Sequence, residues 1–223
     1  MTPATATSTV MRPTQFQIAP IQQHIEHEIE TLMASFPKPE KLSADERRGV
    51  IARYSAVLEG NFIYWMTGAL LSVKSAQARS IILDNLHEEV RDAHPLMMRK
   101  FAKAAKAFPT DADSLAVDQN LTKVRLFIGR LSAVRIVATM AFFEGLIQLY
   151  MGYLADLARL QGSSEMEYTD VHGVCDIAHT AGLYRALQAE MALSDEPMTD
   201  ATDVYEGVDL LRALFENIAT GRA

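Results

Sequence analysis

Apolar residues recur along this chain at the three- and four-residue spacing of amphipathic helices. No segment alternates apolar and polar positions over the length of a strand, so the pattern predicts an all-α fold without a sheet. Breaks at proline, glycine and serine clusters divide the pattern into a bundle of about seven helices. We expect them over residues 16–35, 43–73, 76–108, 115–161 with a break or kink, 168–193 and 200–219.

Local signals support several of these boundaries. Ser43 followed three residues later by Glu46 is typical of a capping box, which satisfies the free amides at a helix start. Pro37 and Pro109 lie where the first and third helices are expected to end, since proline cannot continue a helix.

Length and composition favour a single folded domain. The chain has 223 residues, of which 49% are hydrophobic, enough to cover one large core. Residues 1–14 are rich in threonine, alanine, serine and proline and lack the apolar stretch of a signal peptide. We therefore expect a disordered tail over residues 1–14 and one helical domain over residues 15–223.

The charge and the cysteine content restrict the classes of partner and the cellular location that we expect. The formal net charge is −7 and no basic stripe is present, which argues against nucleic acid as a partner. A single cysteine, Cys175, excludes an internal disulfide and fits a cytoplasmic location. The most apolar region, residues 126–160, is interrupted by Arg130, Arg135 and Glu144, so we expect no membrane span.

The sharpest chemical motif is His172-x-x-x-Asp176-x-x-His179. On a helix these three positions lie within about 60° of one another, so the side chains share one face over two turns. Imidazoles together with a carboxylate suit iron, manganese or zinc. Cys175 lies about 100° around the helix from Asp176, and we do not assign it a role as a nucleophile.

Two carboxylates stand inside strongly apolar segments. Glu144 follows Ala141-Phe142-Phe143, and Glu59 lies between Leu58 and Phe62. Burying an unpaired charge is costly, so each glutamate needs a metal, a proton or a cationic partner such as an arginine. Gly60 and Gly145 directly follow the two glutamates, where a missing side chain would let a neighbouring helix approach.

Two ligand assignments compete. Both use a polar segment, residues 84–95, within the third helix. The first takes three imidazoles and three carboxylates, namely Glu59, His94, Glu144, His172, Asp176 and His179. The second follows the ferritin-like di-iron bundle, in which a glutamate and a Glu-x-x-His pair alternate, with aspartate in place of glutamate in both pairs. Its members are Glu59, Asp84, His87, Glu144, Asp176 and His179.

The first assignment resembles the haem-oxygenase-like di-iron oxidases and oxygenases. The resemblance covers about residues 51–187 and rests on the order of the ligands, with His172, Asp176 and His179 as the final motif. The intervals also fit: 35 residues from Glu59 to His94, 50 from His94 to Glu144 and 28 from Glu144 to His172. Residues 85–101, with two glutamates before His94, also look like this family.

The resemblance implies an enzyme of specialised metabolism that holds two iron ions and uses O₂. It implies a small-molecule substrate, with an amino acid or a derivative favoured here, and allows an external reductant and a homodimer. Some members carry one more ligand, and the candidates for it or for a supporting contact are Asp84, His87 and Glu88. Helical phase makes Arg91 the best-placed contact for a substrate carboxylate. Trp65, Phe143 and Tyr168 are candidates for the pocket wall.

A non-catalytic helical protein with a structural metal site, or none, is the competing functional class. The ordered ligand set argues against it. Metal analysis and O₂ consumption would separate the two classes.

Overall fold

The computed structural model describes residues 18–193 and 201–222. The expected tail, residues 1–14, lies outside them. In the described part the protein has nine α-helices and no strand, which confirms the all-α prediction but exceeds the expected number of about seven. The α-helices are α1 (Ile18–Ser35), α2 (Ala44–Leu58), α3 (Asn61–Ser72), α4 (Ala76–Arg91), α5 (His94–Ala104), α6 (Asp111–Ile128), α7 (Ala133–Leu160), α8 (Glu167–Leu193) and α9 (Glu206–Thr220).

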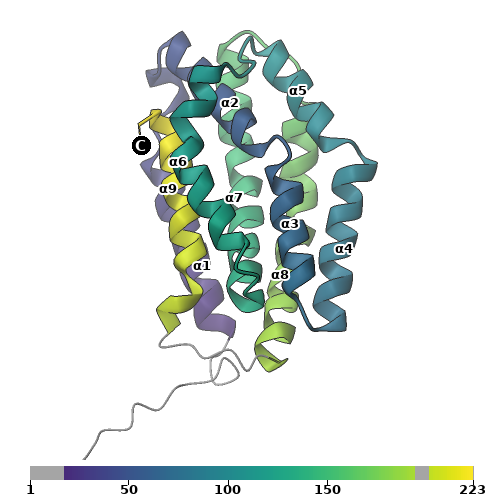
Figure 1. The fold of residues 1–223 in the computed structure, drawn as a ribbon. Coiled ribbons are helices and arrows are strands. Elements are labelled where there is room, and N and C mark those ends of the chain that lie inside the picture. Colours follow the sequence, from purple (N-terminus) through teal and green to yellow (C-terminus); the bar gives the residue numbers. More distant parts are fainter. Residues whose placement is uncertain (1–17, 194–200, 223) are drawn as a thin grey trace, which may run out of the picture.

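The helices stand side by side around α7, with α6 and α9 on one side and α3, α4 and α8 on the other (Figure 1). Two short 3₁₀ turns, Pro39–Lys41 and Ala201–Val204, complete the described elements. Helix α7 is buried nearly all round and packs along α8. A helix that is apolar on every side must lie in a core, so α7 forms the centre of the bundle.

Helix α7 also meets the length and composition of a membrane span, which the sequence pattern did not predict. However, 83% of its most apolar window is buried inside the protein. The surrounding helices therefore account for its apolar surface. Its one buried carboxylate, Glu144, lies in the middle of this apolar environment and is 3% exposed.

The expected helix over residues 43–73 is divided into α2 and α3. The capping box of Ser43 and Glu46 is present, but α2 ends with Glu59 as its C-cap. Gly60 follows with a φ of +80°, a left-handed conformation that glycine adopts without strain. No heavy atom lies within 4 Å of a Cβ built on Gly60, so its role is this turn rather than the close helix approach that was expected.

Gly145 does allow a close approach. A Cβ at this position would lie 2.9 Å from Cδ1 of Ile29, so a larger residue here would have to displace the end of that side chain. The contact lies directly after Glu144, where α1 packs on α7.

The expected helix over residues 76–108 is also divided, into α4 and α5. Ala93 lies between them with a φ of 55°, a left-handed conformation that costs a non-glycine residue roughly 1 kcal/mol. His94 is the first residue of α5 and is 4% exposed. The turn breaks the helical phase between residues 84–91 and His94, on which part of the sequence argument depended.

A buried carboxylate ties α4 to α8. Glu190 of α8 is 2% exposed and accepts hydrogen bonds from the backbone amides of Lys74, at 3.0 Å, and Ser75, at 2.6 Å. Ser75 is the N-cap of α4, so these bonds hold the start of α4 against α8. The two helices that carry most of the site described below are thus fixed relative to each other.

Candidate metal centre

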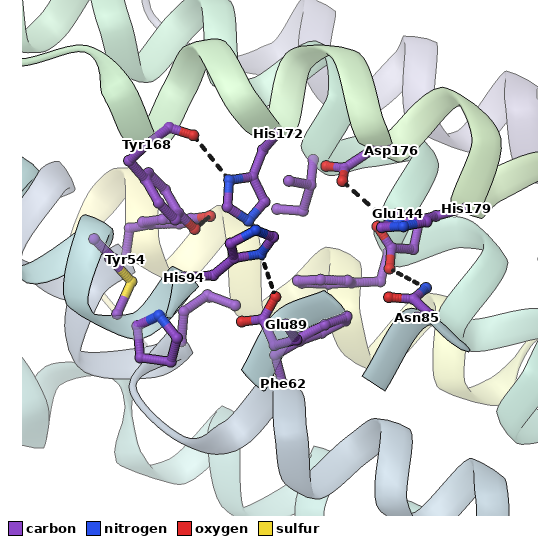
Figure 2. A pocket seen from close by; sticks show the side chains of 15 residues that line it. Tyr54, Phe62, Asn85, Glu89, His94, Glu144, Tyr168, His172, Asp176 and His179 are labelled. Atoms are coloured by element: carbon purple, nitrogen blue, oxygen red, sulfur yellow. Dashed lines mark hydrogen bonds and ion pairs between the residues drawn. The ribbon is translucent and has the colours of Figure 1, made fainter. Parts of the chain in front are cut away.

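A pocket opens between α2, α3, α4, α5, α7 and α8, and the polar groups of the sequence motifs gather on its inner side (Figure 2). The space between its walls is about 450 Å³, including the part open to solvent. The lining residues are Tyr54, Leu58, Phe62, Asn85, Glu89, His94, Pro95, Met98, Phe143, Glu144, Ile147, Tyr168, His172, Asp176 and His179.

A first group of metal-competent donors consists of Glu89, His94 and His172. One donor atom from each lies within 4.8 Å of the other two. Nδ1 of His94 lies 2.7 Å from Oε2 of Glu89. The ring centroids of His94 and His172 are 4.4 Å apart, and the rings meet edge to face. Since a carboxylate has two oxygens, Glu89 can hold His94 with one and offer the other to a metal.

The orientation of His172 is fixed by its own helix. Its Nδ1 lies 2.8 Å from the carbonyl oxygen of Tyr168, one turn earlier, and must donate because a carbonyl can only accept. This bond sets the tautomer and leaves Nε2 to act as a ligand. Figure 2 shows the free side of the ring turned toward His94. Burial, together with the nearby His94, lowers the pKa of His172 and favours the neutral, ligand-competent form.

A second group of donors lies farther along α8. Sγ of Cys175, a carboxylate oxygen of Asp176 and a ring nitrogen of His179 lie within 4.8 Å of one another. Asp176 is 1% exposed, and its Oδ2 has no hydrogen-bond partner among the described residues. A buried carboxylate oxygen without a partner is costly, so this atom is the clearest sign that the site is built for a cation.

Glu144 of α7 lies beside this second group. Its Oε1 accepts a hydrogen bond of 2.9 Å from Nδ2 of Asn85, and its Oε2 lies 3.8 Å from Nδ1 of His179. Asn85, on α4, is itself only 4% exposed. The amide therefore holds one oxygen of the carboxylate in place and orients the other toward His179.

The charges at this end of the pocket are strongly coupled. Burial and the neighbouring Glu144 raise the pKa of Asp176 to about 7. Burial would lower the pKa of His179, but contacts with Asp176, Glu144 and Glu88 outweigh it and raise the pKa to about 11. Near pH 7 the metal-free protein thus carries an imidazolium at His179, which partly neutralises the surrounding carboxylates.

Metal binding is expected to release at least one proton per chain near pH 7. The reason is that a metal can use His179 only in its deprotonated form. Because the pKa of His179 is raised to about 11, its proton is fully bound below that value, and apparent metal affinity should rise with pH. A pH indicator in weak buffer would report the release as Zn²⁺ or Fe²⁺ is added. Metal uptake without proton release would contradict this expectation. So would an apparent metal affinity that does not change over about one pH unit either side of neutral.

Five of the six residues of the first ligand assignment line the pocket, and Glu59 does not. As the C-cap of α2, Glu59 has a side chain that is 38% exposed and paired with Arg99. Glu89 lies where a sixth ligand was sought. Glu89 is not among the ligands expected from the sequence, but its side chain is only 12% exposed and contacts His94.

The residues particular to the ferritin-like assignment do not reach the pocket. Asp84 and His87 are both exposed on α4. Glu88 is half-buried, and its Oε2 lies 2.8 Å from Nε2 of His179, so it remains a candidate for a supporting contact. Arg91, expected at a substrate carboxylate, has a side chain that is 66% exposed and pairs with Asp92. It ends α4, so the helical phase that placed it toward the site does not extend to His94.

The predicted wall residues are placed in two layers. Phe143 and Tyr168 line the pocket, and Trp65 lies behind Phe143 in edge-to-face contact at 5.4 Å. Phe62 stacks on Phe143 at 5.3 Å. The hydroxyl of Tyr168 is hydrogen-bonded at 2.8 Å to that of Tyr54, which the sequence argument did not single out. An aromatic wall therefore encloses the donors on one side.

The family model for iron-containing redox enzymes, of the haem-oxygenase-like type, matches residues 23–214. The chain belongs to this family. No curated protein matches it significantly. The protein is thus an iron-containing oxidoreductase with an all-helical fold consistent with that family.

The donors of this family member suit iron. The pocket offers three imidazoles and three carboxylates, from His94, His172, His179, Glu89, Glu144 and Asp176. Mixed nitrogen and oxygen ligands of this kind are typical of non-haem iron. In the described structure, Oδ2 of Asp176 has no hydrogen-bond partner, so a metal ion would bind this oxygen without displacing a protein contact. The residues present therefore fit the metal that the family implies.

Proposed function

We propose that this protein is a non-haem di-iron oxidase or oxygenase that uses O₂ to transform a small molecule. The observation that carries the proposal is the division of the pocket donors into two groups. One is formed by Glu89, His94 and His172, and the other contains Asp176 and His179. Each group has the size of a binding site for one ion, and Glu144 contacts the second.

The pocket residues would hold two ions, one at each donor group. His94 and His172 would bind one ion with Glu89, and Asp176 and His179 would bind the other. Glu144, held by Asn85 on one oxygen, would offer the other oxygen to the ion at Asp176 and His179. Two ferrous ions at such a site supply the electrons that reduce O₂, which is chemistry no side chain provides.

The pocket wall would place the substrate and limit water. Leu58, Phe62, Phe143 and Ile147 give an apolar surface beside the donors. The described lining residues include no lysine or arginine. A carboxylate on the substrate would therefore be balanced by the metal centre, and the rest of the molecule would contact the apolar wall.

The substrate we propose is an amino acid or an amino-acid derivative in specialised metabolism. The outcomes considered are desaturation, C–C or C–N cleavage, N-oxygenation and oxidative rearrangement such as nitrile formation, with an external reductant where the balance of electrons requires one. The ferritin-like alternative is disfavoured because Asp84 and His87 are exposed. A purely structural metal site is disfavoured because the donors line an open pocket, whereas structural sites are closed by protein ligands.

Oxygen uptake tests the proposal. Protein loaded anaerobically with Fe²⁺ and mixed with O₂ should consume O₂ faster than free Fe²⁺ at the same concentration, and a screen of amino acids should identify compounds that accelerate it. Protein loaded with Zn²⁺ is the control, since zinc occupies the same ligands without redox chemistry. Uptake no faster than that of free iron, with every compound tested, would leave a structural site as the better account.

A further inference from the structure

Helix α8 carries two pairs of metal-competent residues, each four positions apart. His172 and Asp176 form one pair, and Cys175 and His179 form the other. Residues four positions apart on a helix are separated by only about 40° and lie one above the other. Cys175 is about 100° from Asp176, but this spacing brings it onto the same side of the helix as His179.

The structure places the thiol within reach of the second donor group. Sγ of Cys175 lies 3.2 Å from Oδ1 of Asp176, to which the thiol donates. The same Oδ1 lies 3.6 Å from Nδ1 of His179. The sulfur, a carboxylate oxygen and a ring nitrogen thus surround one point, with one donor atom from each of the three within 4.8 Å of the others.

A separate observation shows that the carboxylate of this group is incompletely bonded by the protein. Asp176 is 1% exposed, and its Oδ2 has no hydrogen-bond partner in the described structure. A thiol can satisfy only one oxygen of the carboxylate, and it does so at Oδ1. A metal ion beside Asp176 would satisfy the carboxylate that the protein leaves incompletely bonded.

We propose that Cys175 is a thiolate ligand of the metal ion held by Asp176 and His179. On binding, the thiol loses its proton to solvent and its sulfur forms a bond to the metal. The inference rests on the proposed two-metal centre and distinguishes its two positions. One would have imidazole and carboxylate ligands only, and the other would add a sulfur.

A thiolate changes the metal preference of the position that it joins. Sulfur is a softer ligand than imidazole or carboxylate, so the site at Asp176 and His179 should prefer thiophilic divalent ions more than the site at His94 and His172. The two positions of one centre would then differ in affinity for the same metal, and the difference would depend on Cys175.

Cobalt titration tests the inference directly. Cys175 is the only cysteine in the chain, so a thiolate-to-cobalt charge-transfer band can come from no other residue. Metal-free full-length protein titrated anaerobically with Co²⁺ should develop this near-ultraviolet band. Cys175→Ser and Cys175→Ala should lack it, and Cys175→Ala should bind one of the two cobalt equivalents at least about tenfold more weakly.

A matched variant makes the result specific. His94→Ala removes a ligand of the other donor group and should weaken the other equivalent while keeping the band. Binding of two cobalt ions by the native protein without the band would overturn the role of Cys175 and leave the two-metal centre standing. A band that persists in Cys175→Ser would also overturn it. Failure to bind any cobalt would overturn both the inference and the proposed function.

Discussion

Substitution of His172 by alanine is expected to abolish O₂ activation and to lower metal affinity by roughly 100-fold or more. The loss of a supporting contact alone costs about 10- to 100-fold, and His172 would be a direct ligand. Its ring is fixed by the bond from Nδ1 to the carbonyl of Tyr168 and faces His94. Isothermal titration with Fe²⁺ under anaerobic conditions and O₂ uptake would measure both effects.

His87→Ala is the matched control, because it removes the imidazole that the ferritin-like assignment would use in place of His94 and His172. His87 is exposed on α4 and does not line the pocket. Its substitution should leave iron affinity and O₂ uptake close to those of the native protein. If His87→Ala is inactive and His172→Ala is active, the ligand set is the ferritin-like one and the centre proposed for this pocket is wrong.

The second large effect is expected at Glu89. Glu89→Ala should lower iron affinity by roughly 10- to 100-fold, because it removes both a potential ligand and the partner that holds His94. Oε2 of Glu89 lies 2.7 Å from Nδ1 of His94, and both side chains are largely buried. Glu89→Gln keeps the shape but not the charge and should recover only part of the affinity.

Glu59→Ala provides the comparison, since the sequence assignment chose Glu59 and the structure brings Glu89 to the pocket. Glu59 is paired with Arg99 at an exposed position, where an ion pair contributes about 1 kcal/mol or less to stability. Its substitution should leave iron binding nearly unchanged. A large loss of iron in Glu59→Ala together with normal binding in Glu89→Ala would restore the assignment made from sequence.

The local sequence pattern is sufficient to place part of this pocket. His172, Asp176 and His179 lie on one uninterrupted helix, so helical geometry alone places them on one face. Glu144 could be singled out because it is a charge within an apolar run, and α7 is indeed buried at that point. In both cases the local pattern contains all the information that the prediction needs.

The two helix boundaries that the sequence pattern missed lie at two turns. The left-handed conformations at Gly60 and Ala93 divide helices that the periodicity predicts as continuous. Gly60 is a recognisable signal, but alanine rarely adopts this conformation, so nothing at Ala93 marks the turn. Beyond it, helical phase no longer relates Glu89 or Arg91 to His94. Packing against α8, which is not local information, decides that Glu89 faces inward and Arg91 faces solvent.

We expect one chain to hold two iron ions in this pocket. Anaerobic titration of metal-free protein with Fe²⁺, followed by removal of unbound iron and quantification of iron and protein, tests it most directly. The two donor groups of Figure 2 predict saturation close to two irons per chain. Saturation at one iron per chain or less, with protein that remains folded, would contradict the di-iron centre.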